Sequence, residues 1–92
     1  MRLRWTEGAA RDLENITYYL LDSTPQHGPH LVRSIYAAIA ALPRFPNRGR
    51  VGKKAGTLEL VLPSLPYLVV YQIAGEVIYV VRILHGAQQW PE

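Results

Sequence analysis

The sequence predicts an α+β fold in which a helical hairpin packs on a small antiparallel sheet. Residues 67–73 and 77–84 are rich in β-branched and aromatic side chains, and each run has the length of a strand. A turn at residues 74–76 separates the two runs. The first half of the chain instead repeats its apolar residues at helical spacing in two successive segments. Because both strands are apolar on each side, we expect them at the centre of the sheet with at least one face covered.

The first predicted elements are a short strand and a helix. Leu3, Arg4 and Trp5 alternate in polarity, and Thr6 is a suitable N-cap for the helix that follows. We expect this helix to run from Glu7 to about Leu21 or Asp22, because Pro25 is incompatible with its continuation. One face of the helix carries Ala9, Leu13, Ile16 and Leu20.

A second helix follows after a tight connection at residues 26–29. Pro29 suits its first turn, and Pro43 and Pro46 end it. Its predicted buried face consists of Leu31, Ile35, Ala38 or Ile39, and Leu42. The short connection predicts two antiparallel helices whose apolar faces require a third surface, which the downstream sheet supplies.

A third strand is predicted at residues 57–62, before the hairpin. Leu58, Leu60 and Leu62 point to one face, whereas Glu59 and Val61 point to the other. The three residues 74–76, with a central glycine, fit a hairpin with a bulge or a short irregular loop. The predicted order is β-α-α-β-β-β, a three-stranded antiparallel meander with the first strand as a candidate edge strand.

Size and composition predict one domain over residues 1–92. There is no cysteine, and the apolar runs are far shorter than the roughly 20 residues that a membrane span needs. No apolar signal core follows the basic N-terminus. We therefore expect a cytoplasmic protein that does not associate with a membrane.

The positive charge is concentrated in one segment, residues 44–54. This segment has a charge of +5, whereas the whole chain has +3, so the remainder has −2. Such a flexible cationic loop can contact phosphate or an acidic protein surface, and the alternative is a solvated loop that promotes solubility. Its basic residues are Arg44, Arg48, Arg50, Lys53 and Lys54.

One group of residues could cleave RNA without a metal. His85 could be the base or the acid, Arg82 and the basic segment could stabilise the phosphorane, and Glu59 is a spare carboxylate. The structural alternatives are that His85 donates to a backbone carbonyl and that Arg82 pairs with Glu59 across the sheet. No metal or cofactor set is predicted, because His27 and His30 straddle a helix break and lack a third ligand.

Several motifs resemble those of the RelE/ParE family of bacterial toxins. The resemblance extends over essentially the whole chain, and it includes Trp5-Thr6, Gly49-Arg50, the strand 66–71 and the closing residues 82–91. It implies a helical hairpin on an antiparallel sheet. It also implies a cognate antitoxin of the ParD or RelB type, encoded beside the toxin.

The resemblance leaves two targets open, DNA gyrase for ParE-like members and the ribosome with its messenger RNA for RelE-like members. This sequence departs from the nuclease pattern. Leu58 stands where many relatives carry arginine, Leu68 and Gln72 occupy the strand where another arginine is expected, and no terminal tyrosine is present. We therefore favour a gyrase inhibitor with no catalytic residue over a nuclease using His85, Arg82, Arg50 and Glu59. A degenerate, non-toxic relative that binds only the antitoxin is a third hypothesis. The expected target contacts are Arg44, Arg48, Arg50, Lys53, Lys54, Arg82 and Trp90.

Overall fold

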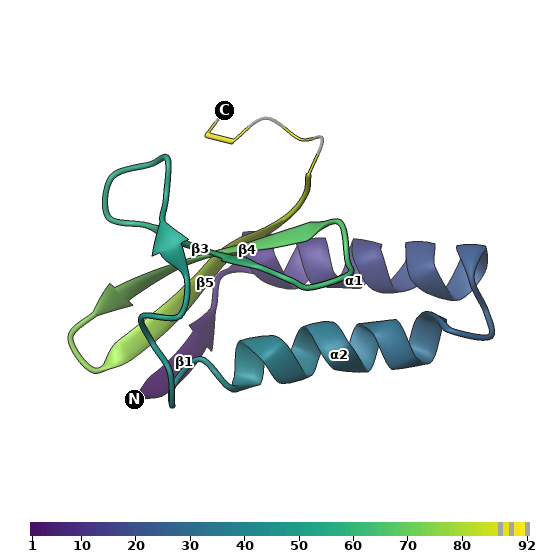
Figure 1. Ribbon diagram of the computed structural model, residues 1–92, viewed down its shortest axis with the longest axis horizontal. Helices are drawn as coiled ribbons and strands as arrows, with labels where there is room; N and C mark the ends of the chain where they lie inside the picture. Colours follow the sequence, from purple (N-terminus) through teal and green to yellow (C-terminus); the bar gives the residue numbers. More distant parts are fainter. Residues whose placement is uncertain (87, 89, 92) are drawn as a thin grey trace.

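The computed structural model describes residues 1–86, 88, 90 and 91. Both helices lie on one side of a twisted sheet, and the described part of the C-terminal segment lies on the other (Figure 1). This is the expected α+β architecture of a helical hairpin on a sheet. The elements in chain order are β1 (Arg2–Trp5), α1 (Glu7–Ser23), α2 (Gly28–Ala40), β2 (Arg50–Val51), β3 (Leu58–Val61), β4 (Tyr67–Ala74) and β5 (Val77–His85).

The sheet has five strands in the order β1-β5-β4-β3-β2. Strands β3, β4 and β5 form the expected antiparallel meander, and the β4–β5 hairpin is central, as predicted. Two features extend it. Strand β1 joins β5 in parallel, with Arg2 opposite Val77. A parallel pair needs a long connection between its strands, and the two helices and strands β2 to β4 lie between β1 and β5 in the chain. The two-residue β2 pairs with β3 at the opposite edge.

The prediction of a three-residue loop in the central hairpin was wrong. Ala74 pairs with Val77, so the turn contains two residues, Gly75 and Glu76. Gly75 has a φ of 59°, which glycine adopts without a steric penalty. The register shift lies inside the hairpin instead, between Val70 and Tyr71.

The helix ends follow the local signals in the sequence. The Thr6 hydroxyl accepts a hydrogen bond from the Ala9 amide at 3.1 Å, which confirms the N-cap of α1. Proline lies in the first turn of α2, also as predicted. A Cβ at Gly28 would lie 2.6 Å from the Leu20 carbonyl oxygen, so the close approach of the two helices requires glycine there.

The hydrophobic core lies between the helices and the sheet. Leu60 and Leu62 are buried in it and Leu58 packs against it, as the alternation in the third predicted strand indicated. From the helices, Ala9, Ile35 and Ile39 are completely buried. Val70 and Leu84 are also buried but lie outside this cluster, because their strands direct them to the other face of the sheet. No helix in the described part of the chain is long and apolar enough to cross a membrane.

Candidate functional site

A hollow of about 340 Å³ lies on the face of the sheet opposite the helices. Apolar side chains of β3, β4 and β5 contribute to its lining, and so does the C-terminal part of the basic segment, through Arg50 and Lys53. Three of the residues proposed for a nuclease, His85, Arg50 and Glu59, line this hollow together with Lys53. Arg82 does not line it.

Glu59 is buried at the centre of this site, and it is not the spare carboxylate that the sequence suggested. Its side chain is 2% exposed. It accepts hydrogen bonds from the Arg50 Nε at 3.2 Å and from the Lys53 backbone amide at 3.0 Å. Arg50 and Glu59 are directly opposite each other in β2 and β3, and this register brings the pair together. The carboxylate therefore offsets part of the positive charge in the hollow.

Arg82 is directed to α1, so the alternative in which it pairs with Glu59 was wrong. Its Nε lies 2.7 Å from Oδ2 of Asp12, and its Nη2 lies 3.2 Å from Oδ1. Asp12 Oδ2 also accepts a hydrogen bond from the Ile83 amide at 2.9 Å. Two carboxylate oxygens thus bind the guanidinium and one strand amide together.

The position of Asp12 follows from the shortness of β1. Strand β1 ends at Trp5 opposite Val80, so no strand of the described residues pairs with the rest of this edge of β5. The start of α1 completes the edge, since the Thr6 amide donates to the Val80 oxygen and the Thr6 hydroxyl donates to the Val81 oxygen. Asp12, about one and a half turns further along the helix, binds the next amide.

His85 lies on the rim of the hollow, at the end of β5. Its amide donates to Gln88 Oε1 at 2.7 Å, and its carbonyl oxygen accepts from the Gln88 amide at 2.9 Å. The imidazole packs edge-on against Tyr67, with 5.9 Å between ring centroids. Burial, and secondarily the neighbouring Tyr19, raises the pKa of the Tyr67 phenol above its ordinary value.

The basic segment is anchored to the sheet, in contrast to the flexible loop that the sequence suggested. Tyr71 is completely buried, and its hydroxyl donates to the Pro46 oxygen at 2.7 Å and accepts from the Gly49 amide at 2.8 Å. A Cβ at Gly49 would lie 2.8 Å from the Tyr71 ring and hydroxyl, so only glycine fits. Burial raises the pKa of Tyr71, and the hydrogen bond from Gly49 acts in the opposite direction.

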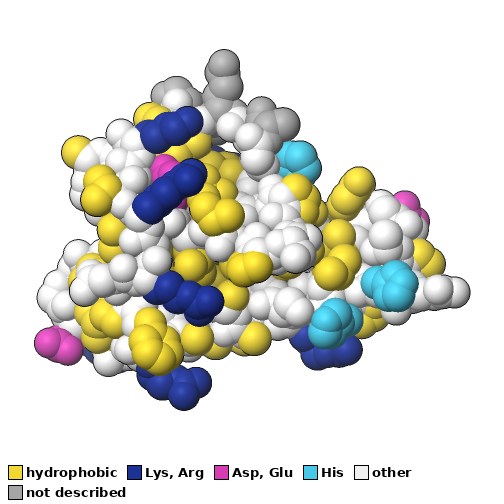
Figure 2. All heavy atoms as spheres, in the orientation of Figure 1, with side chains coloured by type: hydrophobic (Ala, Val, Ile, Leu, Met, Phe, Trp, Pro, Cys, Tyr) yellow, Lys and Arg dark blue, Asp and Glu magenta, His cyan; other side chains and the backbone are white. Residues whose placement is uncertain are grey.

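The remaining cations of the segment are exposed. Among the described residues, neither Arg44, Arg48, Lys53 nor Lys54 takes part in an ion pair. The Lys54 Nζ lies 5.8 Å from the centre of the Trp90 ring, which itself lines the hollow. Figure 2 shows Lys and Arg side chains spaced along this side of the molecule with hydrophobic side chains between them.

Phe45, which no sequence pattern singled out, is 59% exposed in the same segment. With Pro46, Asn47 and Arg48 it lines a second hollow of about 710 Å³. The sequence feature that could have identified Phe45 as a contact residue is its position next to Arg44 and three residues before Arg48. It also lies between two prolines, in a predicted loop.

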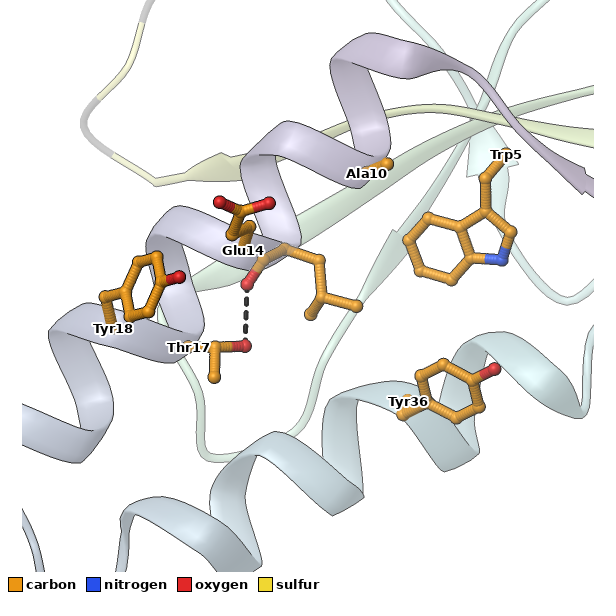
Figure 3. A pocket seen from close by; sticks show the side chains of 7 residues that line it. Trp5, Ala10, Glu14, Thr17, Tyr18 and Tyr36 are labelled. Atoms are coloured by element: carbon orange, nitrogen blue, oxygen red, sulfur yellow. Dashed lines mark hydrogen bonds between the residues drawn. The ribbon is translucent and has the colours of Figure 1, made fainter.

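The helices carry a third concavity, of about 490 Å³, which Figure 3 shows between α1 and α2. The rings of Trp5 and Tyr36 stack on one side of it, with 6.1 Å between centroids and an interplanar angle of 17°. Tyr18, on α1, is 65% exposed, and Glu14 supplies a carboxylate. The exposed tyrosines on these helices are therefore available to a partner. No group of three or more His, Cys, Asp or Glu residues in the described part of the chain could hold a metal ion.

Three bacterial proteins with toxin in their names match this chain over 88% or more of its length. It is 37% identical to a putative toxin, Y4kP, of Sinorhizobium fredii over 91 residues, which is 99% of this chain and 94% of that protein. It is 30% identical to toxin RelE2 of Caulobacter vibrioides, with 91% and 93% of the two chains covered. Toxin RelE1 of the same organism is 29% identical, with 88% of each chain covered.

Solved structures give the same result for the fold. A chain of the chromosomal ParDE toxin–antitoxin system from P. aeruginosa superposes with a TM-score of 0.84 at 27% identity, covering 92% of this chain and 95% of that one. A YoeB/ParE toxin from Agrobacterium tumefaciens has the same fold, with a TM-score of 0.64 at 22% identity and coverage of 92% and 98%.

The family model for the ParE toxin of the type II toxin–antitoxin system parDE matches residues 3–90, from β1 to the C-terminal segment. The matched region includes the anchored basic segment, the Asp12–Arg82 pair and the hollow with its buried glutamate. The chain therefore belongs to the ParE toxin family of type II toxin–antitoxin systems.

Proposed function

We propose that this toxin acts in the bacterial cytoplasm by binding and inhibiting DNA gyrase, without cleaving a bond itself. The observation that carries the proposal is the engagement of two arginines by carboxylates. Glu59 holds Arg50, and Asp12 holds Arg82 away from the hollow. These are the two arginines that a nuclease would need near the scissile phosphate.

The chemical argument concerns the phosphorane formed during RNA cleavage. Its negative charge must be met by preorganised donors, and the loss of one such donor costs roughly a hundredfold in rate. In the hollow, the buried Glu59 carboxylate partly neutralises the charge of Arg50, and it would also repel the phosphorane. His85 is thus a proton-transfer candidate with weak electrostatic support.

The exposed cations are better suited to binding than to catalysis. Arg44, Arg48, Lys53 and Lys54 lie along an anchored segment next to the hollow and Trp90. Such a row of charges attracts an acidic surface or DNA, and gyrase together with its DNA presents both. We infer that these residues contact the target. Arg50 contributes its exposed outer part, since its side chain is 62% exposed.

The same proposal includes a cognate antitoxin of the ParD type. The concavity between α1 and α2 and its exposed tyrosines offer an apolar surface to a partner segment (Figure 3). At the sheet edge, the two-residue β2 with its exposed Val51 can accept an added strand. We expect the melting temperature of the complex to exceed that of the free toxin, because a ligand that binds only the folded state stabilises it. Equal melting temperatures would contradict antitoxin binding.

Supercoiling assays with purified gyrase test the target. Saturating toxin should block supercoiling of relaxed plasmid, and replacing Lys53 and Arg48 together with glutamine should weaken the block. Arg33→Gln is a matched control, because Arg33 is an exposed cation on α2 outside the basic segment. Unchanged supercoiling at saturating wild-type toxin would refute the proposal.

A ribosome-dependent nuclease is the second candidate. The shared hollow of His85, Arg50, Lys53 and Glu59 favours it, and two of the related toxins are named RelE. Toeprinting of translating ribosomes would reveal discrete cuts in messenger RNA if this candidate is right. Loss of those cuts in a folded His85→Ala variant would place the chemistry at His85.

A further inference from the structure

We propose that Phe45 is a base-stacking anchor and that the tip of the basic segment, residues 44–48, binds single-stranded nucleic acid. Phe45 is 59% exposed, whereas Tyr67 and Tyr71 are buried in the core. It is the single phenylalanine of the sequence. The residues around it line a hollow of about 710 Å³ with Phe45 on its wall.

Hydrogen bonds along its length connect the tip to the neighbouring residues and to the sheet. The Phe45 amide donates to the Leu42 oxygen at 3.0 Å, and the Phe45 oxygen accepts from the Arg48 amide at 3.1 Å. Below it, the buried Tyr71 hydroxyl binds both the Pro46 oxygen and the Gly49 amide. An exposed aromatic side chain on a fixed loop loses little conformational entropy when it binds, which favours recognition.

The charge of the tip indicates the chemistry of its partner. Arg44 and Arg48 flank Phe45, both are exposed, and neither has an ion pair with a described residue. No acidic residue occurs between Asp22 and Glu59, and Glu59 is buried against Arg50. Single-strand binding sites combine cations that contact the phosphate backbone with aromatic side chains on which bases stack. In a single strand the face of a base is accessible to an aromatic side chain, whereas in a duplex the neighbouring base pairs cover it. We therefore assign the single-stranded form.

This assignment stands apart from the identity of the toxin's target. Gyrase and the ribosome both hold nucleic acid, and the Phe45 tip would contact it in either complex. The tip is also separate from the hollow at His85, since no described residue lines both hollows.

The test is fluorescence anisotropy with the full-length protein and a labelled oligothymidylate, together with a 2-aminopurine oligonucleotide that reports stacking directly. We expect Phe45→Ala to weaken binding about tenfold or more, in line with the loss of one stacked base. Phe45→Trp should retain binding, and Phe45→Leu should lose it, because leucine keeps the apolar bulk but lacks an aromatic face. Leu21→Ala is the control, since Leu21 is a 42% exposed apolar residue on α1, outside the basic segment.

The salt dependence separates the charges from the ring. Arg44→Gln and Arg48→Gln should each lower the slope of log K against log salt by about 0.7, whereas Phe45→Ala should leave the slope unchanged. Equal affinity of wild type and Phe45→Ala or Phe45→Leu would overturn the proposal, as would equal preference for duplex DNA or an absence of binding at low salt. Gyrase is absent from this assay, so oligonucleotide binding can be observed even if the toxin does not inhibit gyrase. Conversely, a toxin that inhibits supercoiling but does not bind the oligonucleotide would refute only the role of Phe45 as an anchor.

Discussion

Replacement of Asp12 by asparagine tests the contact that joins the first helix to the last strand. The carboxylate accepts two hydrogen bonds from Arg82 and one from the Ile83 amide. Asparagine keeps one oxygen for the Ile83 amide, but it lacks the negative charge and the second acceptor oxygen that bind the Arg82 guanidinium. Hydrogen bonds to charged groups contribute about 1.5–3 kcal/mol. Since the side chains of Arg82 and Asp12 are 26% and 15% exposed, water recovers part of this energy. We expect a loss of about 2 kcal/mol.

Urea unfolding followed by circular dichroism measures this loss, and thermal unfolding should show a decrease of about 10 °C in Tm for a domain of this size. Glu14→Gln is the control on the same helix, because Glu14 is an exposed carboxylate, and it should cost less than about 0.5 kcal/mol. A double-mutant cycle with Arg82→Gln should give a coupling of about 1 kcal/mol or more. A cost for Asp12→Asn equal to that of the control, or a coupling near zero, would refute the role of this pair.

Three further predictions concern the anchored basic segment. Gly49→Ala should destabilise the protein by about 1–3 kcal/mol in urea unfolding, since its Cβ would overlap the Tyr71 ring, and an unchanged stability would contradict the anchor. Glu59→Gln should release the Arg50 charge and delay elution from heparin to higher salt, whereas earlier elution would show that the pair orders the binding surface. The free energy of unfolding should fall as pH rises above about 10, because the unfolded chain then releases a phenolic proton that folded Tyr71 retains. Unfolding measured between pH 9 and 11 tests this, and Tyr71→Phe should reduce the pH dependence.

The local elements of the fold were predictable from the sequence. Helical spacing and the Thr6 cap located α1, and the β-branched runs located β4 and β5, because these signals depend on neighbours within a few residues. The two-residue β2 was not predicted, since nothing in Arg50 and Val51 alone indicates a strand. Its formation depends on pairing with β3.

The candidate site was only partly predictable, because its contacts join residues far apart in the chain. Asp12 and Ile83 are 71 positions apart, and Tyr71 and Pro46 are 25 apart. Composition located the cations and His85 but could not show which of them a carboxylate engages. The pairing of Arg50 with Glu59 follows from strand register, which hydrophobic alternation along one strand does not determine.

Gyrase inhibition by a His85→Ala variant is the most direct test of whether the toxin acts by binding and not by catalysis. If the toxin acts by binding through its basic segment, this variant should block supercoiling as wild type does, while neutralisation of Arg48 and Lys53 should weaken the block. Supercoiling that neither protein affects, together with ribosome-dependent cleavage of messenger RNA that disappears in His85→Ala, would contradict the account.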